Sequence, residues 1–64
     1  MNIAQKIKEL RIEKGYSQAK LANAIGVSQK AIDYWERSVN EPKASNIVAL
    51  VKEFGITFDD FFAE

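Results

Sequence analysis

Four residues whose side chains can form hydrogen bonds lie close together near the middle of the chain: Gln29, Lys30, Asp33 and Tyr34. At about 100° per residue, a helix through this segment would place all four on one arc. Amide, ammonium, carboxylate and phenol groups together donate, accept and touch methyl groups, which is the chemistry needed to contact base edges in a DNA groove. The alternative interpretation of this arc is the solvated face of a surface helix.

The other arc of the same helix is apolar, and it belongs to a longer pattern over residues 18–37. Small or apolar residues are spaced there as in two short helices that meet at a sharp angle, at Ala22, Gly26, Val27, Ile32 and Trp35. A side chain larger than that of Ala22 would push the helices apart. Gly26 is expected to end the first helix in a left-handed conformation, in a turn too tight for most residues. This spacing predicts a helix-turn-helix motif with the polar arc facing outward.

Apolar periodicity and capping residues predict five helices and therefore an all-α fold. The expected ranges are about 3–14, 18–25, 29–37, 44–54 and a short last helix that begins after Thr57. Ser17 and Ser28 are the expected N-caps of the second and third helices. Gly55 is expected to end the fourth helix, and Pro42 keeps the segment before that helix in a loop.

A family resemblance rests on the run LRIEKGYSQAKLANAIGVSQKAIDYWE. It resembles the pattern LR…GxSQxxLAxxxGVSxxxIxxWE of the Cro/CI-type family (lambda repressor-like, XRE) of bacterial and phage transcription regulators. The family's trailing pattern is matched by Pro42, by Ala44–Phe54 and by Gly55–Phe62, so the resemblance covers essentially the whole chain. It implies a single compact five-helix, lambda repressor-like DNA-binding domain over residues 1–64, with the helix-turn-helix at the second and third helices.

The composition excludes several classes of protein. The chain has 64 residues with neither cysteine nor histidine, which argues against disulfides, metal sites of the usual kinds and any evident cofactor or small-molecule ligand. No pair among the remaining reactive side chains has a spacing that suggests an active site, so we do not expect an enzyme. The longest apolar run, 47–51, is too short to cross a membrane, and the N-terminus does not resemble a signal peptide. These features predict a cytoplasmic protein, and the resemblance implies a nucleoid-associated protein of a bacterium or phage.

Each residue of the polar arc has an expected role in base reading, which the resemblance also implies. The amide of Gln29 can donate and accept at once, which matches N6 and N7 of adenine. Lys30 can reach guanine acceptors or a phosphate, and Tyr34 can meet a thymine methyl or a phosphate. Asp33 can contribute only by accepting from N4 of cytosine, since phosphates repel its charge; otherwise it is a tolerated surface charge.

Contacts with the DNA backbone are expected from residues that flank the recognition helix: Gln18, Ser28, Asn40 and Lys43. Gln18 opens the second helix, whose free N–H groups and dipole suit a phosphate, and its side chain could also support Gln29; alternatively, it is a plain helix-start residue. The loop RSVNEPK lacks the glycine and much of the basic charge that are common there in the family. Backbone contacts of this kind position a protein without reading sequence.

The resemblance implies an ion pair between Arg11 and Glu36 that ties the first helix to the end of the third. Removing one partner of a partly buried pair costs more stability than the pair contributes. An alternative role for Arg11 is that of a phosphate ligand. Trp35 is assigned to the core because it shares a face with Ile32.

The charge of the chain is balanced overall but uneven along its length. Nine basic and nine acidic residues give a net charge of zero. Residues 1–43 carry eight basic and five acidic residues, a net charge of +3, and residues 44–64 carry a net charge of −3. Because the positive field of the recognition half is modest, we expect weak non-specific DNA affinity and a shallow salt dependence.

The last segment, GITFDDFFAE, is rich in aromatic residues. Phe58 and Phe61 are expected to complete the core, while Phe62 and Ile56 are expected at the surface. Helix-turn-helix domains gain affinity by pairing on two half-sites, so we expect a two-fold homodimer on a palindromic operator. The expected interface residues are Ile56, Phe58 and Phe62. Alternatively, Phe62 packs back against the preceding helix.

Two functions follow from these observations. The first is a sequence-specific, double-stranded DNA-binding transcriptional regulator, a repressor, that inserts the helix at about 29–37 into the major groove as a dimer. The second is a protein-interaction module on the same fold, antitoxin-like or an adaptor, in which Asp33 and the acidic tail face another protein.

Overall fold

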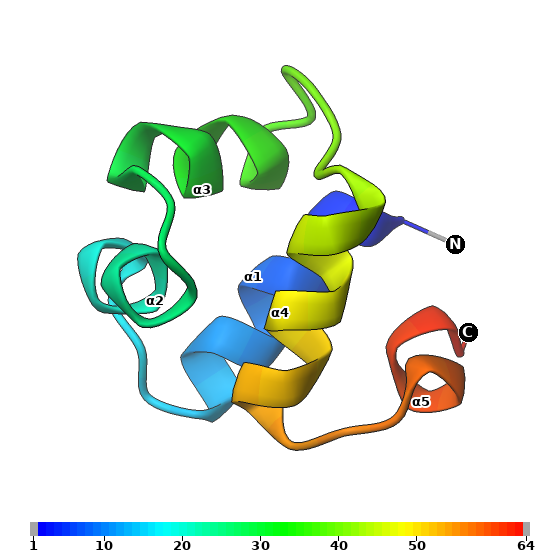
Figure 1. Cartoon of the computed structure of the whole chain (residues 1–64). Helices are drawn as coiled ribbons and strands as arrows, with labels where there is room; N and C mark the ends of the chain where they lie inside the picture. The colour runs from blue at the N-terminus through cyan, green and yellow to red at the C-terminus, as the bar shows by residue number, and fades with distance from the viewer. Residues whose placement is uncertain (1, 64) are drawn as a thin grey trace.

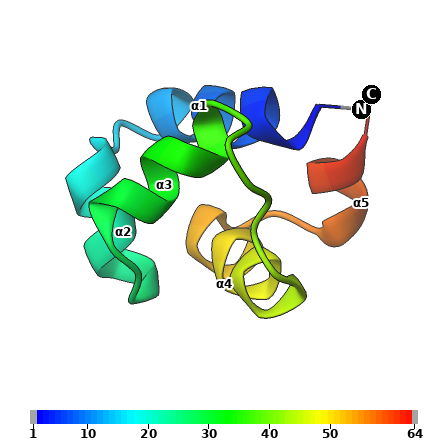
Figure 2. The same cartoon turned by 90° about the horizontal axis from the view of Figure 1, so that it is seen from above.

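A computed structural model describes residues 2–63 of the chain. Within these residues the secondary structure consists of five helices and no strand, which confirms the predicted all-α fold. The helices are α1 (Ile3–Glu13), α2 (Gln18–Ile25), α3 (Gln29–Glu36), α4 (Ala44–Phe54) and α5 (Phe58–Phe62). Figure 1 shows α2 and α3 at one end of the molecule, with α5 on the other side of α4. The same order is seen from above in Figure 2.

The hydrophobic core receives side chains from every helix. Its buried members are Ile7, Leu10, Leu21, Ala22, Ile32, Trp35, Leu50, Val51, Phe54 and Phe61. Most of them recur three or four positions apart within a helix, so each helix presents one apolar stripe to the centre. α3 packs on α2 and α1, and α2 also packs on α4. The apolar positions therefore fix how α3 lies on the rest of the domain.

Side-chain caps explain where most of the helices begin. Four first-turn backbone N–H groups donate to the side-chain oxygen of the capping residue at 3.0–3.1 Å. The donor and acceptor pairs are Gln5 and Asn2, Lys20 and Ser17, Ala31 and Ser28, and Asp60 and Thr57. The predicted caps Ser17 and Ser28 are thus confirmed, and Thr57 caps α5 in the same way. Each satisfies a first-turn donor that has no partner inside its helix.

The turn between α2 and α3 depends on the backbone of Gly26. Its φ is 76°, and the Gly26 and Val27 N–H groups both donate to the carbonyl of Ala22. A Cβ at Gly26 would meet no other atom within 4 Å. The expected left-handed conformation of Gly26 is therefore confirmed. Glycine is required by the left-handed dihedral and not by lack of space.

A second left-handed residue ends α3. Ser38 has φ 60°, its N–H donates to the carbonyl of Trp35, and the N–H of Val39 donates to the carbonyl of Tyr34. These two bonds form a Schellman motif, in which the left-handed position favours glycine. In this loop, which has no glycine, Ser38 adopts the left-handed conformation.

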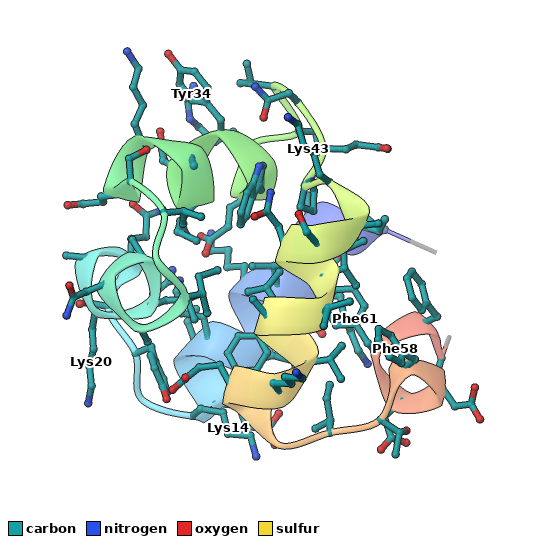
Figure 3. The ribbon with its side chains drawn as sticks, viewed as in Figure 1. Lys14, Lys20, Tyr34, Lys43, Phe58 and Phe61 are labelled. Carbon is teal, nitrogen blue, oxygen red and sulfur yellow. The ribbon has the colours of Figure 1, made fainter. Side chains whose placement is uncertain are left out.

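Phe58 does not lie in the core, so that prediction is wrong. Phe58 is 49% exposed, whereas Phe61 is fully buried (Figure 3). Phe58 and Phe62 are four residues apart and share the outer arc of this short helix, and Phe62 is 43% exposed. Ile56 is partly buried against the core instead of standing at the surface. Because α5 is little more than one turn long, only one of its three phenylalanines, Phe61, is fully buried.

The Ser38→Gly variant tests the cost of the left-handed serine. We expect it to raise the free energy of unfolding by about 0.5–1 kcal/mol in urea titrations, because glycine adopts this φ without strain. The matched control is Ser45→Gly, which makes the same change at an exposed position within α4 and is expected to lower stability. Equal losses in both variants would contradict this assignment.

Candidate nucleic-acid interface

The outer face of α3 carries the four residues predicted to read bases. Ile32 and Trp35 are buried against the rest of the domain, and they leave the opposite side of the helix free. Gln29 and Lys30 are exposed there, while Asp33 and Tyr34 are half-buried. Tyr34 projects away from the body of the protein in Figure 3, and Lys43 lies on the same side. We call the four residues together with Arg37, whose contacts are described next, the α3 face.

Two cations flank the ring of Tyr34. The Nζ atom of Lys30 lies 5.4 Å from the ring centroid, and the guanidinium carbon of Arg37 lies at the same distance. Lys30 is four residues before Tyr34 and Arg37 is three residues after it. At both spacings, side chains are neighbours on a helix surface. Separations below about 6 Å allow cation–π attraction. The aromatic ring and two positive charges therefore form one cluster.

The carboxylate of Asp33 is engaged within the protein. Arg37 donates from Nε to Oδ2 at 3.0 Å, and its Nη2 lies 2.9 Å from the same oxygen. The amide of Gln18 donates to Oδ1 at 3.4 Å. The hydrogen bond from Arg37 holds the pKa of Asp33 below its ordinary value, and the bond from Gln18 acts in the same direction. Asp33 is thus an ionised group whose two oxygens both have protein partners.

Gln18 contacts α3 at a different place from the one expected. Its Nε2 donates to Asp33 and also to Oε1 of Glu36, at 3.3 Å. Among residues 2–63 no hydrogen bond joins Gln18 to Gln29, so the expected support of Gln29 is wrong. The start of α2 faces the second turn of α3 and not its first turn.

Arg11 and Glu36 form a two-pronged ion pair. Nε of Arg11 donates to Oε2 of Glu36 at 2.6 Å, and Nη2 donates to Oε1 at 3.1 Å. The remaining nitrogen, Nη1, donates to the carbonyl of Tyr16 at 2.8 Å. The two side chains are only 13% and 4% exposed, and the hydrogen bond to Glu36 raises the pKa of Arg11. All three guanidinium nitrogens are used, which favours a structural role over a phosphate contact.

These contacts join into a continuous polar chain. It runs from Arg11 on α1 through Glu36, Gln18 and Asp33 to Arg37 at the end of α3. At its inner end the groups are nearly buried, and at its outer end Asp33 and Arg37 are 37% and 58% exposed. We call these five residues the polar chain. It connects the core side of α3 to the α3 face.

A shallow groove lies between α3 and the start of α4. Residues lining it include Ser28, Lys30, Tyr34, Asn40 and Lys43. It thus brings three of the predicted backbone-contact residues next to two of the predicted base readers. Glu41 also lines this groove, and its negative charge weakens the positive field there. The hydroxyl of Ser28 accepts the N–H of Ala31 as a cap, so only its remaining hydrogen-bonding capacity faces outward.

The predicted dimer residues lie elsewhere on the molecule. Phe58 and Phe62 are exposed on α5, and Ile56, which precedes α5 in the sequence, is partly buried against the core. Figures 1 and 2 both place α5 on the opposite side of α4 from α2. The exposed aromatic surface is therefore separated from the α2–α3 end by α4.

Other kinds of site find no support in the described part of the chain. Residues 2–63 contain no group of three or more aspartate, glutamate, cysteine or histidine side chains placed to hold a metal ion. In the same residues no helix is long and apolar enough to cross a membrane.

A sequence profile of the helix-turn-helix family matches residues 7–61. The chain therefore belongs to the helix-turn-helix family of Cro/CI (XRE) type, which confirms the family predicted from the sequence. It is 28% identical over 61 residues to the cryptic phage CTXphi transcriptional repressor RstR of Vibrio cholerae. That match covers 95% of this chain and 55% of RstR, and the chain spans only 31% and 23% of two further curated regulators.

Two solved structures share the fold over nearly the whole chain. The P22 c2 repressor protein, in complex with synthetic operator 9T, has a TM-score of 0.86 and 33% identity, covering 98% of this chain and 96% of that chain. The restriction-modification controller protein C.AhdI from Aeromonas hydrophila has a TM-score of 0.88 and 30% identity, covering 95% and 92%. The five-helix arrangement is thus that of known helix-turn-helix domains.

Arg37 is the residue of the α3 face that sequence reasoning missed. A signal for it was present, since Asp33 and Arg37 are four residues apart and Tyr34 and Arg37 are three apart. Both spacings bring side chains together on a helix. In the sequence, Arg37 stands out only as the last residue of the expected helix at 29–37.

The two ion pairs of the polar chain should differ strongly in their effect on stability. We expect Arg11→Met to lower the free energy of unfolding by about 3 kcal/mol, because Glu36 would be left charged and nearly buried. The matched control is Arg37→Gln, which breaks the exposed pair and should cost less than about 0.5 kcal/mol. Urea unfolding followed by tryptophan fluorescence measures both. Similar losses in the two variants would contradict the assignment of Arg11 as a structural residue.

Proposed function

We propose that this chain is the sequence-specific DNA-binding domain of a transcriptional regulator, a repressor, which inserts α3 into the major groove of operator DNA. The observation that carries this proposal is the α3 face itself. Its polar and aromatic side chains project from a helix whose other side is fixed by the buried Ile32 and Trp35. A single α-helix fits the major groove, where such side chains can meet base edges. Supporting the proposal, the related P22 c2 repressor was solved in complex with a synthetic operator.

We assign base reading to the side chains of the α3 face that can extend into the DNA major groove. Gln29 is exposed in the first turn, and among residues 2–63 its side chain makes no hydrogen bond, so its amide is available to adenine N6 and N7. Lys30 is assigned to guanine acceptors or a phosphate. Tyr34, whose ring lies near the cations of Lys30 and Arg37, is assigned to a thymine methyl or a phosphate. The role of Asp33 is treated separately below.

Phosphate contacts are assigned to the two sides of the α3 face. Asn40 and Lys43 line the groove beside α3, and Ser28 lies at the N-terminus of that helix. Gln18 lies at the N-terminus of α2, where unpaired backbone N–H groups favour an anion. The presence of Glu41 in the groove and the zero net charge of the chain predict a modest contribution from non-specific attraction.

The regulator is proposed to act as a homodimer on a palindromic operator. Phe58 and Phe62 form an exposed aromatic pair on α5, away from the α3 face. Two copies joined there would leave both α3 helices free for half-sites about one helical turn apart. Ile56 would lie at the margin of the interface because it is already partly packed on the core.

A second candidate function is a protein-interaction module on the same fold. It is favoured by one observation, the balanced charge, since many DNA-binding domains carry a positive excess. In that case the acidic groups of α3 and α5 would face another protein. The two candidates make opposite predictions for the exposed residues of the first turn of α3.

The double variant Gln29→Ala/Lys30→Ala tests the DNA-reading function. We expect operator affinity to fall by about 100-fold or more, since each good base contact is worth about 1–3 kcal/mol, while the unfolding midpoint stays nearly unchanged. Fluorescence anisotropy on a duplex enriched from a random pool measures the affinity. Lys14→Ala is the control, because it removes one positive charge at the far end of the molecule from Tyr34 (Figure 3). Equal affinity of the double variant and the wild type would reject this function.

The double variant Phe58→Ser/Phe62→Ser tests the dimer. We expect the wild-type protein to sediment as a dimer at high micromolar concentration. The dimer dissociation constant of the variant should be at least about tenfold larger, because the two aromatic rings would no longer be buried in the interface. Ile12→Ser is the matched control, because Ile12 is an exposed apolar residue on α1. A monomeric wild type, or an equal effect of Ile12→Ser, would contradict the proposed interface.

A further inference from the structure

Asp33 poses an electrostatic problem for a helix that enters a DNA groove. A free carboxylate on the α3 face would stand close to phosphates of the same sign, and repulsion between like charges at an interface opposes binding. In the major groove only an amino group, N4 of cytosine or N6 of adenine, could donate to it. The side chain therefore needs either a base with such a group or a partner from the protein.

The partners of Asp33 come from two helices. Arg37 occupies Oδ2 through Nε at 3.0 Å and Nη2 at 2.9 Å, and Gln18 occupies Oδ1 at 3.4 Å. The contact with Arg37 is charged on both sides, which makes it the stronger of the two. The carboxylate is thus drawn along the helix toward Arg37 and across toward α2, and its charge is balanced before any DNA arrives.

Arg37 has a second contact that reaches the α3 face. Its guanidinium lies over the ring of Tyr34, on which Lys30 also lies. One residue at the C-cap of α3 thereby touches both the acidic and the aromatic member of the face. Because Arg37 is mostly exposed, these contacts contribute little to the stability of the fold. Their effect should fall on the arrangement of the face.

We propose that Arg37 is a positioning residue for DNA recognition, which withdraws the charge of Asp33 from the groove and holds Tyr34 for contact with DNA. Asp33 then serves as an anchor for Arg37 and Gln18 and reads no base. This inference rests on the proposed DNA-binding function and deepens it. It replaces the role in cytosine reading that the sequence suggested for Asp33.

A double-mutant cycle tests this inference. The variants are Arg37→Gln, Asp33→Asn and the two combined, measured by anisotropy on the selected operator at several salt concentrations. We expect Arg37→Gln to weaken binding by about tenfold or more, because the carboxylate is released toward the phosphates. Adding Asp33→Asn should recover most of that loss, so that the double variant binds within about threefold of Asp33→Asn alone. Lys14→Gln and Glu13→Gln, alone and combined, are charge-matched controls on α1 and the turn after it and are expected to act additively.

Two outcomes of the cycle would overturn the inference. If Asp33→Asn removes the preference for a cytosine at one operator position, Asp33 reads that base. If the losses are additive and Arg37→Gln lowers the salt dependence by about one phosphate contact, Arg37 simply binds a phosphate. In contrast, the inference predicts an unchanged base preference for Asp33→Asn at every position of the operator.

A measurement without DNA separates this inference from the proposed function. Carboxyl carbon NMR of the free protein reports the pKa of Asp33, which we expect to rise toward its ordinary value in Arg37→Gln. An unchanged pKa would mean that Arg37 does not hold Asp33, whatever the protein binds. A wild type that selects no DNA sequence would overturn the proposed function and with it the role of Arg37, even if the pKa responds as expected.

Discussion

The packing of α3 against α1 and α2 is the constraint on which the rest of the structure depends. Ile32 and Trp35 are buried on one side of the helix, and the left-handed Gly26 sets the angle at which α3 leaves α2. With that side fixed, the helix has only one face left to present to a partner. The small side chain of Ala22, which is also buried, lets the two helices approach. This packing decides which residues of α3 lie on the α3 face.

The polar chain gives α3 a second attachment of a different kind. At its inner end, the pairing of Arg11 with Glu36 is nearly shielded from water, so it can hold the end of α3 against α1. At its outer end, the pairing of Asp33 with Arg37 is exposed and stabilises little. Gln18 bridges the two ends through one amide. One side chain therefore joins the nearly buried ion pair to the exposed one.

The sequence was sufficient to predict what depends on spacing and local chemistry. Helix positions, the caps Ser17 and Ser28 and the apolar face of α3 follow from periodicity and from the first-turn donors that caps satisfy. It was not sufficient where a side chain chooses among several partners in space. Gln18 bonds Asp33 and Glu36 because α2 crosses α3 one turn later than expected, and Phe58 faces solvent because a helix as short as α5 fully buries only Phe61. Neither outcome is encoded in spacing alone.

The most direct test of the central claim is selection of duplexes from a random pool by the wild-type protein, followed by sequencing. We expect enrichment of an inverted repeat whose half-sites are centred about 10 base pairs apart, since two α3 helices would enter successive major grooves on one side of the DNA. Enrichment of no sequence, with only weak and salt-sensitive retention of DNA, would contradict the claim that the α3 face reads an operator.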